Sequence, residues 1–116
     1  MCARISKKNC IFAAVIIYNT TYTMPEDDAR DFVIWVTQVM LPAIEKDGRL
    51  RNPRLLRILS HRDQESECMS LQLEVETTAE LHRWYTQQGA ELQQELMRTF
   101  DQRIVGFSTI MEEILG

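Results

Sequence analysis

The polar residues best suited to chemistry lie in three segments that are distant in the sequence: Asn19, Arg57, Ser70, Gln72 and Glu74. The segment with Ser70, Gln72 and Glu74 alternates apolar and polar residues, the pattern of a strand with one buried face. Extending this pattern to the other two segments puts all five side chains on the other face of one sheet. A hairpin turning at residues 63–66 would place Arg57 opposite Gln72 and diagonally beside Glu74. An enclosed guanidinium must pair with a carboxylate or bind an anion. The pattern predicts a site for a small carboxylate or phosphate, with a structural Arg57–Glu74 ion pair as the alternative.

Other kinds of site have weaker support in the sequence. The two histidines do not form a His-x-x-x-His pair, and the three cysteines (Cys2, Cys10 and Cys68) lack the spacing of metal ligands. No cysteine or serine stands beside a histidine in the way that nucleophilic catalysis requires. We therefore predict no metal, no cofactor and no catalytic residue, and we favour a binding module over an enzyme.

A strand–helix–strand pattern that occurs twice positions these residues. The first copy comprises Val15–Thr23, Glu26–Asp47 and Arg54–His61, and the second comprises Cys68–Glu76, Thr78–Phe100 and Ile104–Met111. This β-α-β-β-α-β order is the ferredoxin-like α+β fold, a four-stranded antiparallel sheet with two helices on one face. Such sheets usually order their strands 4-1-3-2, which makes the second strand an edge.

Local signals mark the helices. Thr23-Met24-Pro25-Glu26 reads as a capping box for the first helix, and Thr77 is expected to cap the second. Pro42 predicts a kink or an end near Leu41, because proline removes a helix hydrogen bond. Gly89 interrupts the second helix, and we expect it to permit close packing on the sheet.

The strands predict which side chains face the helices and which face the open side. Tyr18, Thr20 and Tyr22 are expected to face the helices, as are Leu56 and Ile58. The open face would carry the polar group described above and several apolar residues, namely Val15, Ile17, Leu55 and Leu59. An exposed apolar patch of this kind usually marks an interaction site. We predict a homodimer through the open sheet face that encloses a partly polar cavity.

Composition limits the classes of partner. The chain has 116 residues, a net charge of −4 and a pI near 5.2, which fits one domain and disfavours nucleic acid and anionic membranes. Residues 49–62 are basic, but the third strand lacks the outward aromatics with which RNA-recognition motifs stack bases. We expect a flexible extension over residues 1–13 and one domain over 14–116. The apolar run Ile11–Ile17 lacks a cleavage site and is too short to span a bilayer, so a cytoplasmic protein is expected.

Several short motifs resemble those of a bacterial domain-of-unknown-function family in the dimeric α/β-barrel superfamily. They are Ile16-Ile17-Tyr18-Asn19, Trp35, Met40-Leu41-Pro42, Gln72 and Arg103-Ile104-Val105-Gly106-Phe107. The resemblance covers Val15 to Glu113 and implies a ferredoxin-like subunit and a face-to-face homodimer, without an activity. The family often has His-Ile-Pro where this chain has Met40-Leu41-Pro42, which disfavours an enzymatic role for that position.

The superfamily also contains cofactor-independent monooxygenases and haem-degrading enzymes. A strand asparagine and a helix histidine are functional in the haem-degrading group, and by resemblance Asn19 and His82 would take these roles. His82 lies beside the apolar stripe of its helix, however, a position typical of an exposed side chain. The sequence thus favours a non-enzymatic module that binds a small anion, with a monooxygenase-like enzyme as the alternative.

Overall fold

The computed structural model describes residues 15–60 and 65–115, so the predicted extension over residues 1–13 and half of the predicted turn at 63–66 lie outside the described residues. The strands are β1 (Ile16–Pro25), β2 (Leu50–Arg57), β3 (Ser66–Val75) and β4 (Val105–Glu112). The first helical region comprises η1 (Glu26–Asp28), α2 (Ala29–Trp35), η2 (Val36–Met40) and α3 (Leu41–Asp47). The second comprises α4 (Thr78–Trp84), η3 (Tyr85–Gly89) and α5 (Ala90–Thr99).

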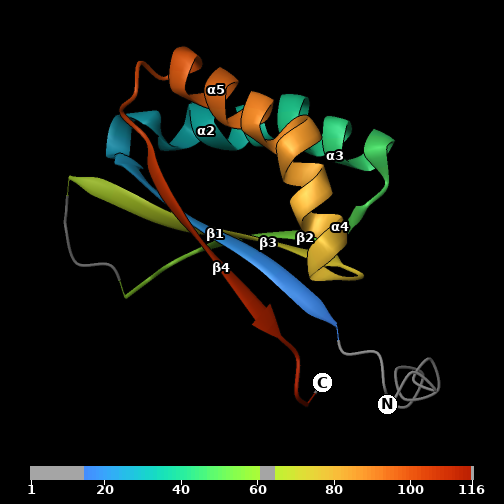
Figure 1. The fold of residues 1–116 in the computed structure, drawn as a ribbon. Coiled ribbons are helices and arrows are strands. Elements are labelled where there is room, and N and C mark those ends of the chain that lie inside the picture. Colours follow the sequence, from blue (N-terminus) through green and yellow to red (C-terminus); the bar gives the residue numbers. More distant parts are fainter. Residues whose placement is uncertain (1–14, 61–64, 116) are drawn as a thin grey trace.

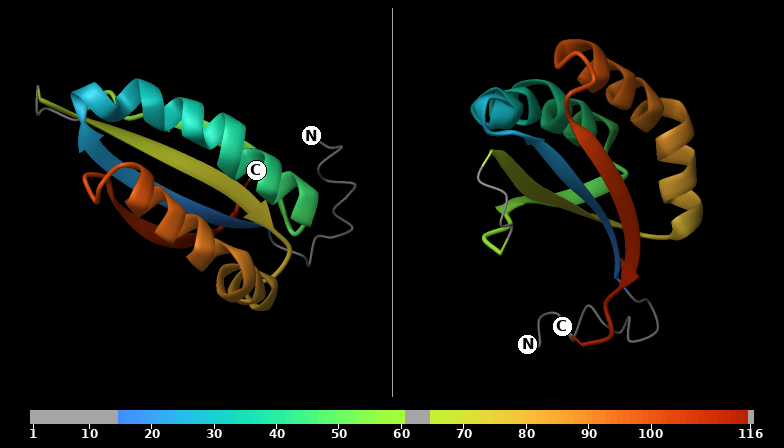
Figure 2. Two further views of the ribbon diagram at one scale, coloured as in Figure 1. Left: turned by 90° about the horizontal axis from the view of Figure 1, so that it is seen from above. Right: turned by 90° about the vertical axis from the view of Figure 1, so that its left-hand side faces the viewer.

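The four strands form one antiparallel sheet in the order β2-β3-β1-β4, with β2 and β4 at the edges. Both helical regions lie on the same side of this sheet, and its other face is uncovered (Figures 1 and 2). The ferredoxin-like α+β fold predicted from the sequence is confirmed. The two faces of the sheet therefore have different environments within one chain.

The first helix runs from Glu26 to Asp47, as predicted, but the predicted Thr23 cap is wrong, and the break expected near Leu41 is a change of helix type rather than an end. Thr23 does not cap the helix, because β1 continues to Pro25 and the Thr23 hydroxyl lies 3.4 Å from the sulfur of Cys68. Pro42 does not end the helix. A π-helical segment, η2, precedes it directly, and the Leu41 N–H bonds to the Val36 carbonyl. The wider turn accommodates the hydrogen-bond defect that proline introduces.

The second helix begins as predicted, with the Thr77 hydroxyl accepting a hydrogen bond of 3.1 Å from the Glu80 N–H. A second π-helical segment, η3, separates α4 from α5, and the two helices meet at an angle (Figure 1). A Cβ on Gly89 would lie 2.7 Å from the Trp84 ring and 2.8 Å from the Tyr85 ring. Gly89 is therefore in close contact, but with these two rings rather than with the sheet.

The core lies between the sheet and the helices. Alternate residues of β3, from Met69 to Val75, are buried beneath the helices, where Phe32 is 0% exposed. The Phe32 ring packs against Tyr22 and Phe100 with centroid distances of 4.9 and 6.5 Å. These contacts fix α2 against β1 and against the end of α5.

The predicted pairing of β2 with β3 is wrong. Arg54 rather than Arg57 lies opposite Gln72, and Leu56 lies opposite Ser70 rather than Leu73. An irregularity between Arg51 and Arg54, where Asn52 has a φ of +53°, shifts the register. A shift by an odd number of residues also exchanges the two faces of a strand. Leu55 consequently packs against the core, and Leu56 lies on the open face.

Candidate functional site

Four of the predicted site residues meet on the open face of the sheet. Asn19 of β1 lies opposite Gln72 of β3, and the Ser70 hydroxyl donates a hydrogen bond to the Asn19 side-chain oxygen. Glu74 lies on the same face and accepts a hydrogen bond of 3.0 Å from the Asn52 amide. The structure therefore places Asn19, Ser70, Gln72 and Glu74 in one polar row on this face, with a hydrogen bond between Ser70 and Asn19.

Arg57 does not join this group. It lies opposite Met69, on the side of the strand that faces the helices, and its guanidinium bonds to Glu67 at 2.9 Å. The alternative Arg57–Glu74 ion pair is wrong for the same reason. Arg54 occupies the place opposite Gln72, and among the described residues it has no ion-pair partner. A cation is thus present beside the polar row, but it comes from a different residue.

The open face also carries apolar side chains, mainly along the edge strand β4. Every residue of β4 is exposed, including Val105 at 66% and Phe107 at 63%. The register with β1 places Val105, Phe107 and Met111 on the open face, and Leu56 lies on that face from the other edge. An isolated subunit therefore presents a polar centre with apolar groups at both edges of its sheet.

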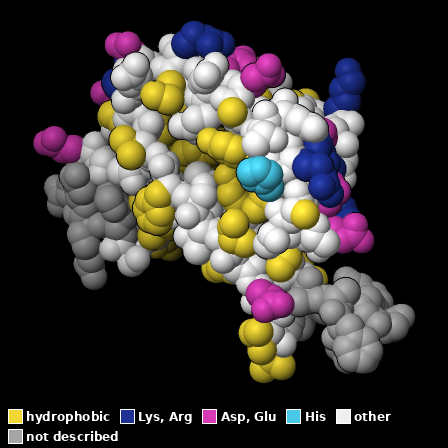
Figure 3. Space-filling view, viewed as in Figure 1, with side chains coloured by type: hydrophobic (Ala, Val, Ile, Leu, Met, Phe, Trp, Pro, Cys, Tyr) yellow, Lys and Arg dark blue, Asp and Glu magenta, His cyan; other side chains and the backbone are white. Residues whose placement is uncertain are grey.

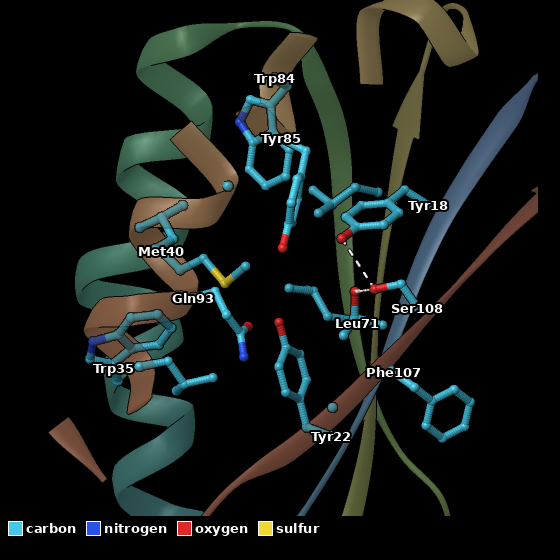
Figure 4. Close-up of a pocket in the computed structure, with 16 residues that line it drawn as sticks. Tyr18, Tyr22, Trp35, Met40, Leu71, Trp84, Tyr85, Gln93, Phe107 and Ser108 are labelled. Carbon is cyan, nitrogen blue, oxygen red and sulfur yellow. Dashed lines mark hydrogen bonds between the residues drawn. The ribbon is translucent and has the colours of Figure 1, made fainter. Parts of the chain in front are cut away.

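A cavity of about 190 Å³ lies on the other side of the sheet, beneath the helices (Figure 4). Aromatic side chains from both layers form much of its wall, and the edge-to-face contact of Tyr18 with Trp84 has a centroid distance of 6.0 Å. The lining residues that matter here are Tyr18, Tyr22, Trp35, Met40, Trp84, Tyr85, Gln93 and Ser108. None of the described lining residues carries a formal charge at neutral pH.

Polar groups converge on this cavity. The Tyr22 and Tyr85 hydroxyls and the Gln93 amide point into the space, whereas the Phe107 ring points away from it (Figure 4). The Ser108 hydroxyl donates to the Tyr18 hydroxyl at 3.2 Å and lies 3.0 Å from the Thr20 hydroxyl. The cavity thus combines aromatic walls with hydroxyl and amide groups, the usual composition of a small-molecule site.

The electrostatics of Tyr22 favour its neutral form. Burial raises the pKa of the Tyr22 phenol above its usual value, and the neighbouring Tyr18 raises it further. The phenol is therefore protonated at neutral pH and can donate a hydrogen bond to a bound molecule. It is unsuited to act as a base at that pH.

The local sequence explains how these groups come together. Tyr18, Thr20 and Tyr22 are alternate residues of β1, so they share the face that the helices cover. On the second helix, η3 and Gly89 set the positions of the Trp84 and Tyr85 rings. The Trp84 indole donates to Gln88 at 2.5 Å, and the Gln88 amide donates to the Ala43 carbonyl at 3.2 Å. These bonds connect the two helices that roof the cavity.

Sequence reasoning did not identify this cavity. The inward orientation of Tyr18 and Tyr22 was a usable signal, because hydroxyls under the helices need hydrogen-bond partners there. Trp35 and Trp84 are both buried in the wall of the cavity.

The haem interpretation required Asn19 and His82 to act together. Asn19 lies on the open face of the sheet, whereas His82 is exposed on α4, which covers the opposite face. The sheet therefore separates the two side chains within a subunit. Among the described residues, no group of three or more His, Cys, Asp or Glu side chains could hold a metal ion.

Comparison with known proteins identifies the family. A domain of unknown function, DUF4286, matches residues 15–114. The chain belongs to this family. No curated protein matches it. None of the described helices has the length and hydrophobicity needed to cross a membrane.

Solved structures with the same fold include three bacterial or environmental proteins of low sequence identity. A putative antibiotic biosynthesis monooxygenase from Bordetella bronchiseptica has a TM-score of 0.68 at 14% identity, over 88% of this chain and 99% of that one. A dimeric ferredoxin-like protein from an uncultured marine organism has a TM-score of 0.66 at 11% identity, over 89% and 98%. An ethyl tert-butyl ether d (ethd) family protein from Bacillus halodurans has a TM-score of 0.62 at 18% identity, over 86% and 99%.

Proposed function

We propose that this protein is a homodimeric binding module that holds a small, uncharged aromatic molecule between its helices and its sheet. The observation that carries the proposal is the cavity into which the Tyr22 hydroxyl, the Tyr85 hydroxyl and the Gln93 amide point. Aromatic walls supply dispersion and apolar contact, and the polar groups fix the orientation of a ligand.

The size and charge of the cavity define the class of ligand. A cavity of roughly 150 Å³ is sufficient to bind benzene, and this one measures about 190 Å³. It would therefore accept a single ring with a small polar substituent. A charged ligand would lose its hydration without meeting an opposite charge, because the described lining residues are neutral.

The open face supports the homodimer. Phe107 and Val105 would be removed from water if a second subunit packed on this face, and one of the similar solved structures is a dimeric ferredoxin-like protein. In such a dimer Asn19, Gln72 and Arg54 would lie at the interface. The predicted anion site belongs to this interface, with Arg54 in the role first expected of Arg57.

Titration with a simple phenol tests the binding proposal. We expect para-ethylphenol to quench the tryptophan fluorescence saturably, because Trp35 and Trp84 line the cavity. Gln93→Leu removes a polar group from the wall, and we expect it to weaken binding by about tenfold, the effect of losing one hydrogen bond. Gln94→Leu alters the exposed neighbouring residue and serves as the matched control. Absence of saturable quenching, or equal effects of the two substitutions, would contradict the proposal.

A monooxygenase-like enzyme is the second candidate. Its support is the fold that the chain shares with the putative antibiotic biosynthesis monooxygenase from Bordetella bronchiseptica. The reaction would convert a single-ring phenol and O2 to a quinone and water: the ring C–H para to the hydroxyl becomes C=O with one oxygen atom of O2, and the other oxygen atom leaves as water. Oxygen uptake with meta-cresol, above the uncatalysed rate and reduced by Tyr22→Phe, would favour this candidate. An oxygen uptake rate equal to the uncatalysed rate would contradict the monooxygenase candidate and leave the binding module as the only proposal.

A further inference from the structure

A groove of about 350 Å³ lies beside the cavity, between α4 and the edge strand β4. It is lined by Thr78, Leu81, His82 and Ile110, together with three residues that also line the cavity: Tyr18, Tyr85 and Ser108. Figure 3 shows the histidine, in cyan, beside apolar side chains on this side of the molecule. The groove and the cavity are therefore adjacent, with shared walls.

Tyr85 forms the boundary between the two spaces. Its hydroxyl points into the cavity (Figure 4), while the residue is 44% exposed and also borders the groove. The close contact of Gly89 with the Tyr85 ring limits the position of that ring. A side chain at the junction of two hollows, exposed on the outer side, can turn to admit a ligand between them.

We propose that the cavity and the groove form one bipartite site, and that its ligand is an aromatic ring carrying an apolar chain of several carbons. This inference rests on the proposed function, because the ring occupies the cavity. The chain leaves between Tyr85 and Ser108 and lies along the groove against Ile110. The hydroxyls of Tyr18 and Ser108 stand at the junction, where they can bond to a polar group on the ring.

Two observations favour this ligand over a single ring. The cavity is smaller than the roughly 300–1,000 Å³ of typical ligand sites, whereas the groove adds a space larger than the cavity itself. The apolar side chain that the groove presents, Ile110, is 54% exposed on β4. A chain packed against it would be removed from water together with that side chain.

A pair of phenols that differ only in chain length tests the inference. Each buried methylene can strengthen binding by up to about fourfold, so para-pentylphenol, with partial burial, should bind about tenfold more tightly than para-ethylphenol. Ile110→Ser should remove most of this difference without changing the affinity for para-ethylphenol. Ile34→Ser, which alters a similarly exposed isoleucine on α2, is the matched control and should preserve the difference.

The outcomes separate this inference from the proposed function. If both phenols bind equally, or if Ile110→Ser retains the full difference, the bipartite site is wrong and the cavity proposal stands. If para-pentylphenol binds and para-ethylphenol does not, or if neither binds, the proposed function is wrong as well. Both isoleucines are exposed, so neither substitution removes a buried group from the core.

Discussion

The two faces of the sheet differ in burial, although the same strands form both. On β3, Leu71 and Leu73 are buried beneath the helices of their own chain, whereas Gln72 and Glu74, which alternate with them, face the open side. The helix side has an aromatic cavity within a core that the helices of the same chain cover. The open side has a hydrogen-bonded polar row with apolar groups, such as Phe107, at its edges.

The two faces are suited to different roles. A core face that leaves an aromatic cavity, with hydroxyls directed into it, is suited to holding a ligand. A face that leaves large apolar side chains in water is suited to assembly. Substitutions on one face should therefore change ligand binding or folding, and substitutions on the other should change association.

The largest expected effect is on stability. Phe32→Ala removes a fully buried ring that contacts Tyr22 and Phe100, and we expect it to lower the free energy of unfolding by about 3–5 kcal/mol. Phe107→Ala, a matched change on the open face, should lower the unfolding free energy of the monomer by under about 0.5 kcal/mol. Urea denaturation at low protein concentration measures both. Similar losses would show that the open face contributes to the monomer's own core.

The next effect concerns association. Phe107→Glu places a charge on the open face, and we expect the dissociation constant of the dimer to rise by about 100-fold or more, as for a buried interface residue. Sedimentation velocity over a range of concentrations measures the change. Ile34→Glu, on the outer side of α2, is the control and should leave the dimer intact. A wild-type protein that sediments as a monomer at micromolar concentration would contradict the assembly.

Gly89 tests how tightly the cavity wall is packed. Gly89→Ala should strain the Trp84 and Tyr85 rings at about 1–3 kcal/mol, while alanine recovers about 1 kcal/mol of helix propensity. We expect a net destabilisation of about 1 kcal/mol and weaker binding of para-ethylphenol. Thermal denaturation and the fluorescence titration measure these changes. A more stable variant with unchanged binding would show that the rings move freely.

Arg54 and Arg57 of β2 test which face binds an anion. We expect phosphate to raise the Tm of the wild type and of Arg57→Gln by a few degrees, and to have no effect on Arg54→Gln. The reason is that Arg54 lies opposite Gln72, whereas Arg57 pairs with Glu67 on the other parity. A thermal shift assay over a phosphate series measures the effect. Equal responses of the two variants to phosphate would contradict the proposed anion site on the open face.

The smallest effect concerns acid stability. Arg103 bonds to the Asp28 carboxylate at 2.8 and 3.0 Å, and these hydrogen bonds lower the pKa of Asp28 from 3.8. This stabilisation is complete above the unfolded-state pKa and is lost as the pH falls through the lowered folded-state pKa. Asp28→Asn should therefore have a lower Tm than the wild type at neutral pH, with the difference vanishing in strong acid. A constant difference at all pH values would contradict this assignment.

The sequence predicted the regular strands better than the irregular one. In β3 the alternation from Met69 to Val75 predicted that Gln72 faces the open side, and extending the pattern to β1 gave the faces of Tyr18 and Asn19. The irregularity in β2 lies at Asn52, just before Pro53, and it reversed the expected faces of Leu55 and Leu56. The alternation from Leu55 to Leu59 does not predict the register in which β2 pairs with β3.

The cavity could not be predicted from sequence periodicity, for a different reason. Its shape depends on how far the rings of Trp84 and Tyr85 stand from the sheet, which the π-helical segment η3 and the Gly89 contact determine. Helical periodicity predicts which residues face inward but not the gaps between them. The polar row was found because hydrogen bonding between strands follows the register of β1 and β3 directly.

A crystal structure of the protein grown with para-ethylphenol tests the central claim most directly. We expect the ring between Tyr22 and Tyr85, with its hydroxyl within hydrogen-bonding distance of the Gln93 amide or of the tyrosine hydroxyls. An empty cavity at saturating phenol, or a phenol bound only on the open face near Asn19, would contradict the account.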